Sequence, residues 1–243
     1  MDILNISERD VLNYFNNLKL NKNEVNYIIF HRKRYAFLLN LLSEYTSKYP
    51  KNRKIKILDI GAWLELFLIK KYFNNIIIDS LGFIPDYLYG LVRKHTKFDL
   101  NELQDYKKLP IKEKYDIIIM TEVIRYLYIR PELLFNFIKK ILKPDGFLIV
   151  QSLNAVSLDK RINMFFGRNP HKRANLSKDE PYHFGEYTLS ELILLGKNTG
   201  FNYDKYYLRN YYNPPNKKYR FLELLLKIYP NFREGITIIY GKK

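Results

Sequence analysis

The fold is decided by the stretch Ile-Leu-Asp-Ile-Gly-Ala-Trp-Leu-Glu, residues 57–65. Its first four residues are apolar except for Asp59, which is the pattern of a short strand buried on both faces. A strand followed at once by a glycine turn is typical of parallel α/β sheets, where the turn approaches a ligand. Trp63, Leu64 and Glu65 are unusual here, because a ligand-binding turn normally leaves its backbone bare at these positions. The stretch therefore predicts an α/β fold and raises the question of what its turn holds.

Strands and helices alternate through the rest of the chain. We predict strands at 55–60, 76–79, near Phe98, 115–120, 147–151, 201–208 and 236–240. The clearest helices between them are predicted at 62–73, 131–142 and 188–198. Because parallel strands need helical crossovers, this alternation indicates a doubly wound, mainly parallel sheet.

The chain is predicted to contain an N-terminal helical cap and one larger domain. Residues 1–50 form the cap, in which Ser7 and Asp10 make a capping box and a second helix runs from about Glu24 to Ser47. The basic turn at 31–34 on this helix is interpreted as a solvated face, with contact to an anionic substrate as the alternative. Residues 51–243 form the sheet domain, and 154–187 form a polar loop on its substrate side.

Composition narrows the classes of function. The 243 residues include no cysteine, which excludes disulfides, thiolate zinc sites and a cysteine nucleophile. The net charge of +16 favours an anionic partner, either nucleic acid, a phosphorylated substrate or an acidic membrane surface. A bias towards Lys, Asn, Ile and Tyr would give the same charge without any function. We expect no signal peptide, no transmembrane segment, no metal site and a cytoplasmic location.

Candidate binding residues follow the strands, because parallel sheets bind ligands at the carboxyl ends of their strands. An acid about 20 residues after the first turn commonly accepts hydrogen bonds from a ribose diol, which assigns that role to Asp79. The predicted cofactor-binding residues are Asp59, Gly61, Ala62, Asp79, Asp99, Leu100, Thr121 and Glu122.

Taken together, these segments resemble the class I S-adenosylmethionine-dependent methyltransferases. The resemblance rests on Ile57–Gly61, Asp79, Phe98–Leu100, Tyr115–Ile124 and Leu142–Val150, and on His183–Leu192, which is similar to a stretch of small-molecule and saccharide-cluster members. It covers roughly residues 53 to 241. It implies a seven-stranded sheet of order 3-2-1-4-5-7-6 with strand 7 antiparallel. It also implies S-adenosylmethionine as cofactor and direct displacement of its methyl group by a nucleophile.

The sequence departs from the family pattern at two places. One common turn reads Gly-Ala-aromatic-Pro-Gly, whereas Leu64 and Glu65 stand at its last two positions here, so the glycine-rich motif is degenerate. Glu65 either points towards the cofactor or stabilises the first turn of a helix. After the fourth strand, Tyr126 stands where relatives often have histidine. The candidate catalytic residues are therefore His183, Glu122 and Tyr126, with His171 as a weaker candidate base.

We expect methyl transfer to a hydroxyl or similar group of a small anionic substrate, such as a sugar- or lipid-linked molecule. Two alternatives stay open. The first is a catalytically inactive methyltransferase-fold protein that binds or scaffolds a partner, and the second is an RNA methyltransferase, which only the charge supports. The segment Asn213–Asn216 (Asn-Pro-Pro-Asn) follows the sixth strand rather than the fourth, so we interpret it as a rigid loop and not as an amino-methylation motif.

Overall fold

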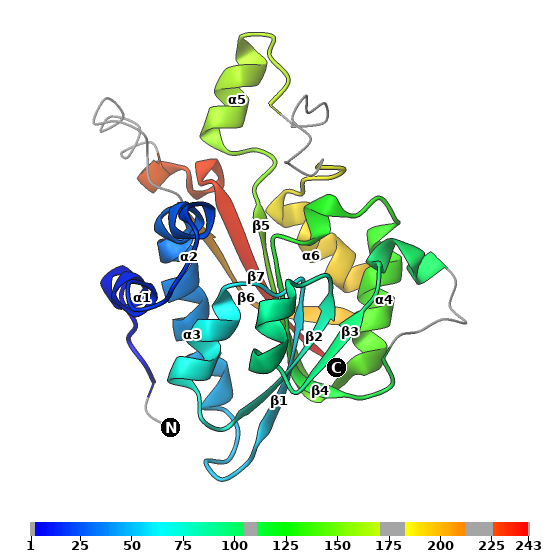
Figure 1. Ribbon diagram of the computed structural model, residues 1–243. Helices are drawn as coiled ribbons and strands as arrows, with labels where there is room; N and C mark the ends of the chain where they lie inside the picture. Colours follow the sequence, from blue (N-terminus) through cyan, green and yellow to red (C-terminus); the bar gives the residue numbers. More distant parts are fainter. Residues whose placement is uncertain (1–2, 105–110, 171–182, 212–225, 243) are drawn as a thin grey trace.

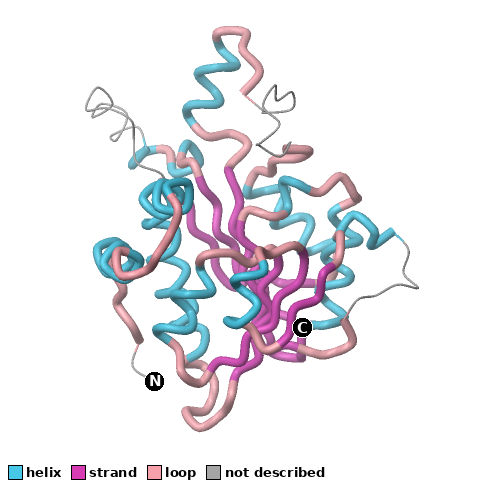
Figure 2. Tube along the Cα trace, in the orientation of Figure 1, coloured by secondary structure: helices cyan, strands magenta, loops and turns pink. Residues whose placement is uncertain are grey.

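A seven-stranded sheet runs through the centre of the protein, in a computed structural model that describes residues 3–104, 111–170, 183–211 and 226–242. Its strand order is β3-β2-β1-β4-β5-β7-β6 (Figures 1 and 2). β7 runs antiparallel to both β5 and β6, and the other neighbouring pairs are parallel. This confirms the predicted fold class, including the antiparallel seventh strand.

The elements have the following bounds. The strands are β1 (Ile55–Ile60), β2 (Ile76–Gly82), β3 (Lys94–Lys97), β4 (Tyr115–Thr121), β5 (Leu142–Leu153), β6 (Phe201–Arg209) and β7 (Gly235–Lys242). The α-helices are α1 (Glu8–Phe15), α2 (Lys22–Thr46), α3 (Glu65–Tyr72), α4 (Pro131–Ile141), α5 (Leu158–Phe165) and α6 (Leu189–Asn198). The short 3₁₀ turns used below are η1 (Asp86–Leu91), η2 (Leu100–Gln104), η4 (Ile124–Tyr126) and η6 (Pro230–Phe232).

Helices cover both faces of the sheet, with α1, α2 and α3 on one side and α4 and α6 on the other (Figure 1). Successive side chains of a strand point to opposite faces, so each central strand contributes to two cores. Ile57 and Ile117 pack with the first group of helices, whereas Leu58 and Ile118 pack with the second. Burial on both faces explains why these strands are continuously apolar.

Local sequence signals set several helix starts. Capping boxes begin α1 at Ser7, α2 at Asn21 and α6 at Thr188, and Pro131 opens α4. The predicted start of the second helix near Glu24 was two residues late, since α2 begins at Lys22.

Three predicted boundaries were wrong. β2 does not end at Asp79 but continues to Gly82, because Ser80 and Leu81 pair with both β1 and β3 and Gly82 pairs with β3. The helix predicted from Ala62 begins at Glu65. The predicted loop at 154–187 contains α5. His171, the segment 213–216 and most of the helix expected at 221–229 lie outside the described residues.

At the amino edge of the sheet, Asp116 holds three separate segments together. Its buried carboxylate pairs with Arg53, with Lys143 at 3.0 Å, and with the backbone N–H of Lys56 at 2.9 Å. A buried carboxylate is not solvated by water, so it depends on the donors around it. Loss of these contacts therefore lowers the stability of the fold.

We expect Asp116→Asn to lower the free energy of unfolding by about 2–4 kcal/mol, because two cations then lose their buried partner. Urea unfolding followed by circular dichroism measures this change. Glu44→Gln is the matched control, since its ion pair with Lys205 is solvent-exposed and should cost less than about 1 kcal/mol. Equal losses in the two variants would show that Asp116 is not a structural anchor.

Candidate active site

Gly61 allows the ends of three strands to meet. It has a φ of +71°, and its N–H donates to the carbonyl oxygen of Leu81 on β2 at 2.9 Å. A Cβ atom at this position would lie 2.4 Å from Cγ2 of Val123, which follows β4. Both the backbone conformation and the close approach therefore require glycine. The structure thus brings the loops after β1, β2 and β4 together, as the sequence predicts for a binding edge.

Two buried carboxylates lie beside this glycine. Asp59 is fully buried, and among the described residues neither of its carboxylate oxygens has a hydrogen-bond partner. Burial raises the pKa of Asp59, and the nearby charge of Glu65 raises it further, whereas Arg34 opposes both effects. Burial also raises the pKa of Glu65, while Arg34 and the backbone N–H groups of its own turn lower it. The buried carboxylate of Glu65 is therefore close enough to act on the pKa of Asp59, and it also accepts from the N–H groups of its own turn.

The positive charge beside these acids comes from α2. Arg34 is only 2 % exposed; its Nε donates to Nδ1 of His31 and its Nη2 to the hydroxyl of Tyr27, both at 3.2 Å. Burial, with the charges of Arg34 and Arg125, lowers the pKa of His31 to about 2, so the imidazole is neutral. The interpretation of 31–34 as a solvated face was wrong for these two residues. A sequence signal existed, because Arg34 lies four residues before Leu38 on the apolar stripe of the helix.

Trp63 uses the altered turn for packing. Its indole Nε1 donates to the hydroxyl of Tyr87 at 3.3 Å, and its ring lies edge-on to Tyr27 with centroids 4.3 Å apart. Tyr87 in turn donates to Glu24 on α2 at 2.5 Å. The turn after β1 is thereby fixed to α2 and η1 by side chains that a glycine-rich turn lacks.

Glu122 marks the end of β4 with a strained backbone. It has a φ of +61°, a backbone conformation that residues other than glycine rarely adopt. Its N–H donates to the carbonyl of Gln151 at 2.8 Å, and its buried carboxylate lies 2.9 Å from Nη1 of Arg125. Arg125 also donates to the hydroxyl of Tyr126 at 2.6 Å. Strain held by such a network is typical of functional sites.

His183 lies next to this network. Its ring is edge-on to Tyr126 with centroids 5.2 Å apart, and its Nδ1 lies 3.2 Å from a carboxylate oxygen of Glu186. The following N–H, that of Phe184, donates to the carbonyl of Arg125 at 2.8 Å. The structure therefore brings the three candidate catalytic residues together around Arg125. The sequence analysis did not identify Arg125 or Glu186.

Asp79 does not join the group at the carboxyl edge. It lies inside β2, three residues before Gly82, and its buried carboxylate pairs with Arg93 on one side and accepts from the hydroxyl of Tyr115 at 3.0 Å. Nε of Arg93 donates to the other oxygen at 2.9 Å. The strand end at which a ribose-binding acid was expected carries Gly82 and the exposed Phe83 instead.

The remaining predicted residues lie near the edge in supporting roles. Asp99, after β3, accepts from the N–H of Asn101 at 2.9 Å and from its side-chain amide at 3.0 Å. Leu100 is buried in the core on the α4 side, and Ala62 in the core on the α2 side. Thr121 is the buried last residue of β4.

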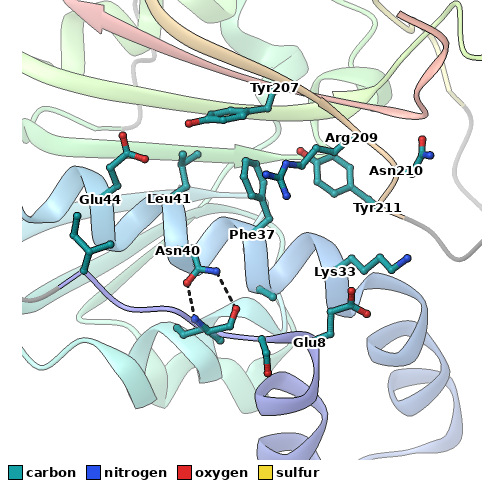
Figure 3. A pocket seen from close by; sticks show the side chains of 14 residues that line it. Glu8, Lys33, Phe37, Asn40, Leu41, Glu44, Tyr207, Arg209, Asn210 and Tyr211 are labelled. Atoms are coloured by element: carbon teal, nitrogen blue, oxygen red, sulfur yellow. Dashed lines mark hydrogen bonds between the residues drawn. The ribbon is translucent and has the colours of Figure 1, made fainter. Parts of the chain in front are cut away.

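A separate cavity of about 630 Å³ lies between α2, the N-terminal segment and the end of β6 (Figure 3). Lys33 and Arg209 line it, and the Arg209 guanidinium lies 4.1 Å from the ring centre of Phe37. Its acids, Glu8 and Glu44, pair with cations at 3.1 and 3.0 Å. Tyr211 connects the cavity with the candidate active site. Its buried hydroxyl contacts Thr237, and the hydroxyl of Thr237 accepts from the side-chain amide of Gln151.

The part of the chain that the structure describes contains neither a metal-binding cluster nor a membrane-spanning helix. Within those residues, no cluster of three or more His, Cys, Asp or Glu side chains could hold a metal ion. Among the described helices, none is long and apolar enough to cross a membrane.

Comparison with known proteins relates this arrangement to one family. A family profile described as "Methyltransferase domain" matches residues 30–206. No curated protein matches the sequence. A SAM-dependent methyltransferase from Archaeoglobus fulgidus superposes with a TM-score of 0.53 at 18 % identity, over 86 % of this chain and 94 % of that one.

Two further solved structures have the same fold. A putative sarcosine dimethylglycine methyltransferase from Galdieria sulphuraria gives a TM-score of 0.56 at 14 % identity, over 97 % of this chain and 98 % of that one. Magnesium protoporphyrin IX methyltransferase from Synechocystis PCC 6803, with bound SAH, gives 0.55 at 9 % identity, over 95 % and 92 %. At such identities the likeness is one of fold alone.

The buried acids predict a pH dependence of stability. Because the folded protein raises the pKa of Asp59 above its ordinary value of 3.8, the folded state holds a proton that the unfolded state releases as pH rises. Protonation of Asp59 therefore stabilises the fold at low pH, and this stabilisation is lost as pH rises through the pKa of Asp59 in the folded protein. We expect wild type to lose stability relative to Asp59→Asn as pH rises above the ordinary carboxyl pKa of 3.8 towards neutral and alkaline pH.

Urea unfolding of both proteins across this pH range measures the difference. The comparison with Asp59→Asn is needed because neutral His31 adds the opposite slope below its ordinary pKa of 6.5 and is common to both proteins. Parallel pH curves would contradict the assignment.

Proposed function

Because the chain belongs to the methyltransferase-domain family, whose cofactor is S-adenosylmethionine, we propose that it transfers a methyl group to a hydroxyl or similar group of a small anionic molecule. The observation that carries the proposal is the buried carboxylate of Asp59, which has no hydrogen-bond partner among the described residues and lies beside Gly61. A buried, unsatisfied carboxylate costs free energy, so such a group at a strand end favours a role in binding a donor.

The aminoacyl end of the cofactor fits the residues present. Its ammonium is a suitable partner for Asp59, and its carboxylate is a suitable partner for the guanidinium of Arg34. Glu65 lies between these charges and balances Arg34 when no ligand is bound. When bound, S-adenosylmethionine supplies an electrophilic methyl group on its sulfonium.

The ribose end fits less well. β2 ends at Gly82 and is followed by Phe83, and Asp79 is already held by Arg93 and Tyr115. A diol placed at this edge therefore lacks the usual carboxylate acceptor. We infer that Asp59, Gly61 and Arg34 contribute most of the binding, and that affinity for the cofactor is lower than in relatives with an acid at this strand end.

Proton transfer is assigned to His183. Glu186 accepts from Nδ1–H, which leaves Nε2 free of a proton and able to take one from a substrate hydroxyl. Tyr126 packs against the ring and, through Arg125, connects it to Glu122. We assign Tyr126 and Glu122 to substrate orientation at the end of β4.

An anionic substrate is supported by charge. The chain carries a net charge of +16, and Lys33 and Arg209 line the cavity beside α2. We further propose that residues 1–50 act as a cap on the domain 51–243, since α2 supplies Arg34 and His31 to the site.

A second candidate function is supported by a different observation of the same site. The charge of Arg34 offsets part of the cost of burying Asp59 and Glu65 without any ligand, and the end of β2 lacks a ribose acceptor. A site balanced by its own side chains suits a non-catalytic protein that keeps the fold to bind a partner.

The two candidates differ in cofactor binding, which Trp63 can report as the only tryptophan of the chain. Titration with S-adenosylhomocysteine should change its fluorescence, and Asp59→Asn should weaken binding by about tenfold or more through loss of a charged hydrogen bond. Asp79→Asn is the matched control and should leave the affinity within about threefold while lowering stability.

A larger effect from Asp79→Asn would restore its ribose-binding role. If wild type shows neither a fluorescence change nor heat of binding at millimolar ligand, the non-catalytic candidate is favoured.

Turnover tests the role of His183. With S-adenosylmethionine and fractionated cell extracts as acceptors, mass spectrometry measures the S-adenosylhomocysteine formed. His183→Gln should slow formation by about 10²–10⁴-fold with unchanged cofactor affinity, and Glu186→Gln should slow it less because the base remains. Unchanged turnover in His183→Gln would exclude His183 as the base.

A further inference from the structure

Helix α5 projects beyond the carboxyl edge of the sheet, away from the body of the protein (Figure 1). Its last turn carries Met164, Phe165 and Phe166, which are 60 %, 84 % and 68 % exposed. Single exposed apolar side chains are ordinary, but consecutive large ones at the tip of a projecting helix leave a continuous apolar surface in water. Such a surface indicates an interaction site.

A second segment with exposed apolar side chains lies beside α5. Ile228 and Tyr229, just before η6, are 59 % and 53 % exposed. The guanidinium of Arg161 on α5 lies 5.0 Å from the ring centre of Phe232 in η6. Asn154, which precedes α5, connects the two segments. Its side-chain amide donates to the carbonyls of Asn231 at 2.8 Å and Arg233 at 2.9 Å. We call Ile162, Met164, Phe165, Phe166, Ile228 and Tyr229 the apolar tip.

The charges around the apolar tip are mainly positive. The cations on its two segments are Arg161, Arg168, Lys227 and Arg233. The acid of α5, Asp159, accepts from the hydroxyl of Ser157 at 2.5 Å. Glu186 is buried against Lys160 and His183 and does not face outwards. Aromatic and aliphatic side chains with cations on the same two segments match the boundary of an anionic bilayer, where rings enter the headgroup region and cations meet phosphates.

The apolar tip is rigidly connected to the candidate base. Lys160, buried on the inner side of α5, donates to the carbonyl of Asn154 at 2.9 Å and pairs with Glu186. Glu186 is the carboxylate that holds His183. Docking of α5 on a surface therefore fixes the position of His183 relative to that surface.

We propose that the apolar tip docks the protein on an anionic lipid bilayer, so that the carboxyl edge of the sheet faces the membrane and receives a lipid-borne acceptor. Docking itself is independent of the proposed methyl transfer, whereas the assignment of the acceptor rests on it. The contact is peripheral, since of the residues that the structure describes the side chains of one helix end and one turn enter the interface.

Vesicle co-sedimentation of the full chain tests the proposal, with vesicles of phosphatidylcholine alone and with about one third phosphatidylglycerol. We expect binding to the anionic vesicles only, weakened by added salt. Phe165→Ser with Phe166→Ser should weaken it by about tenfold or more, because the buried rings supply the apolar term. Arg161→Glu with Arg168→Glu should abolish the preference for anionic lipid.

Leu194→Ser with Tyr203→Ser is the matched control, because these side chains are 55 % and 50 % exposed on α6 and β6, outside the apolar tip. It should bind vesicles as wild type does. Equal loss in this control, or no sedimentation of wild type with anionic vesicles, would overturn the proposal. A wild-type dimer in light scattering that Phe165→Ser with Phe166→Ser converts to monomer would also overturn it, in favour of contact with a second copy.

The vesicle assay contains no cofactor, so its outcome is separate from the proposed function. A protein that binds vesicles but not S-adenosylhomocysteine keeps the docking surface and loses the methyltransferase assignment. A protein that binds S-adenosylhomocysteine but not vesicles loses only the docking surface.

Discussion

The site depends on one electrostatic constraint, the burial of Asp59 and Glu65 beside a single guanidinium from α2. Two carboxylates excluded from water repel each other, and their desolvation is costly unless a cation lies close by. Arg34 supplies that cation from a helix that packs on the sheet face, and it is held by His31 and Tyr27. The position of α2 over the turn after β1 is therefore fixed by charge as well as by apolar packing.

This constraint explains the unusual turn. Glycines in such turns leave room for a ligand, whereas here Trp63 bonds to Tyr87 and Glu65 faces Asp59. Gly61 alone keeps its role, because a side chain there would collide with Val123. The altered residues lie beyond the point where the strand ends must meet. The fold of the edge is thus preserved while the surroundings of the aminoacyl end are rebuilt with charged and aromatic side chains.

The opposite side of the site is organised around Arg125 and Glu186. Arg125 connects Glu122 with Tyr126, and Glu186 connects His183 with Lys160 of α5. The Glu122–Arg125 and Lys160–Glu186 ion pairs are buried, so removal of one partner leaves an uncompensated charge and disturbs the neighbouring hydrogen bonds. The arrangement couples the candidate base to the projecting helix, which is the physical link between the chemistry of the site and the surface on which the protein docks.

The sequence by itself determined the alternation of strands and helices, the strand order implied by the family resemblance, the capped starts at Ser7 and Thr188, and the glycine at position 61. These follow from side-chain periodicity and from contacts between residues three or four positions apart. Tertiary structure alone decided which partners the charged residues have. Asp79 lies back from the edge because β2 continues beyond it, paired with β1 to Leu81 and with β3 to Gly82, and Arg93 satisfies its carboxylate. The place of Arg34 on the apolar stripe of α2 indicates its burial, but not that its charge would act on Asp59 of β1 and Glu65 of α3, because no local pattern specifies which distant charge a side chain will meet.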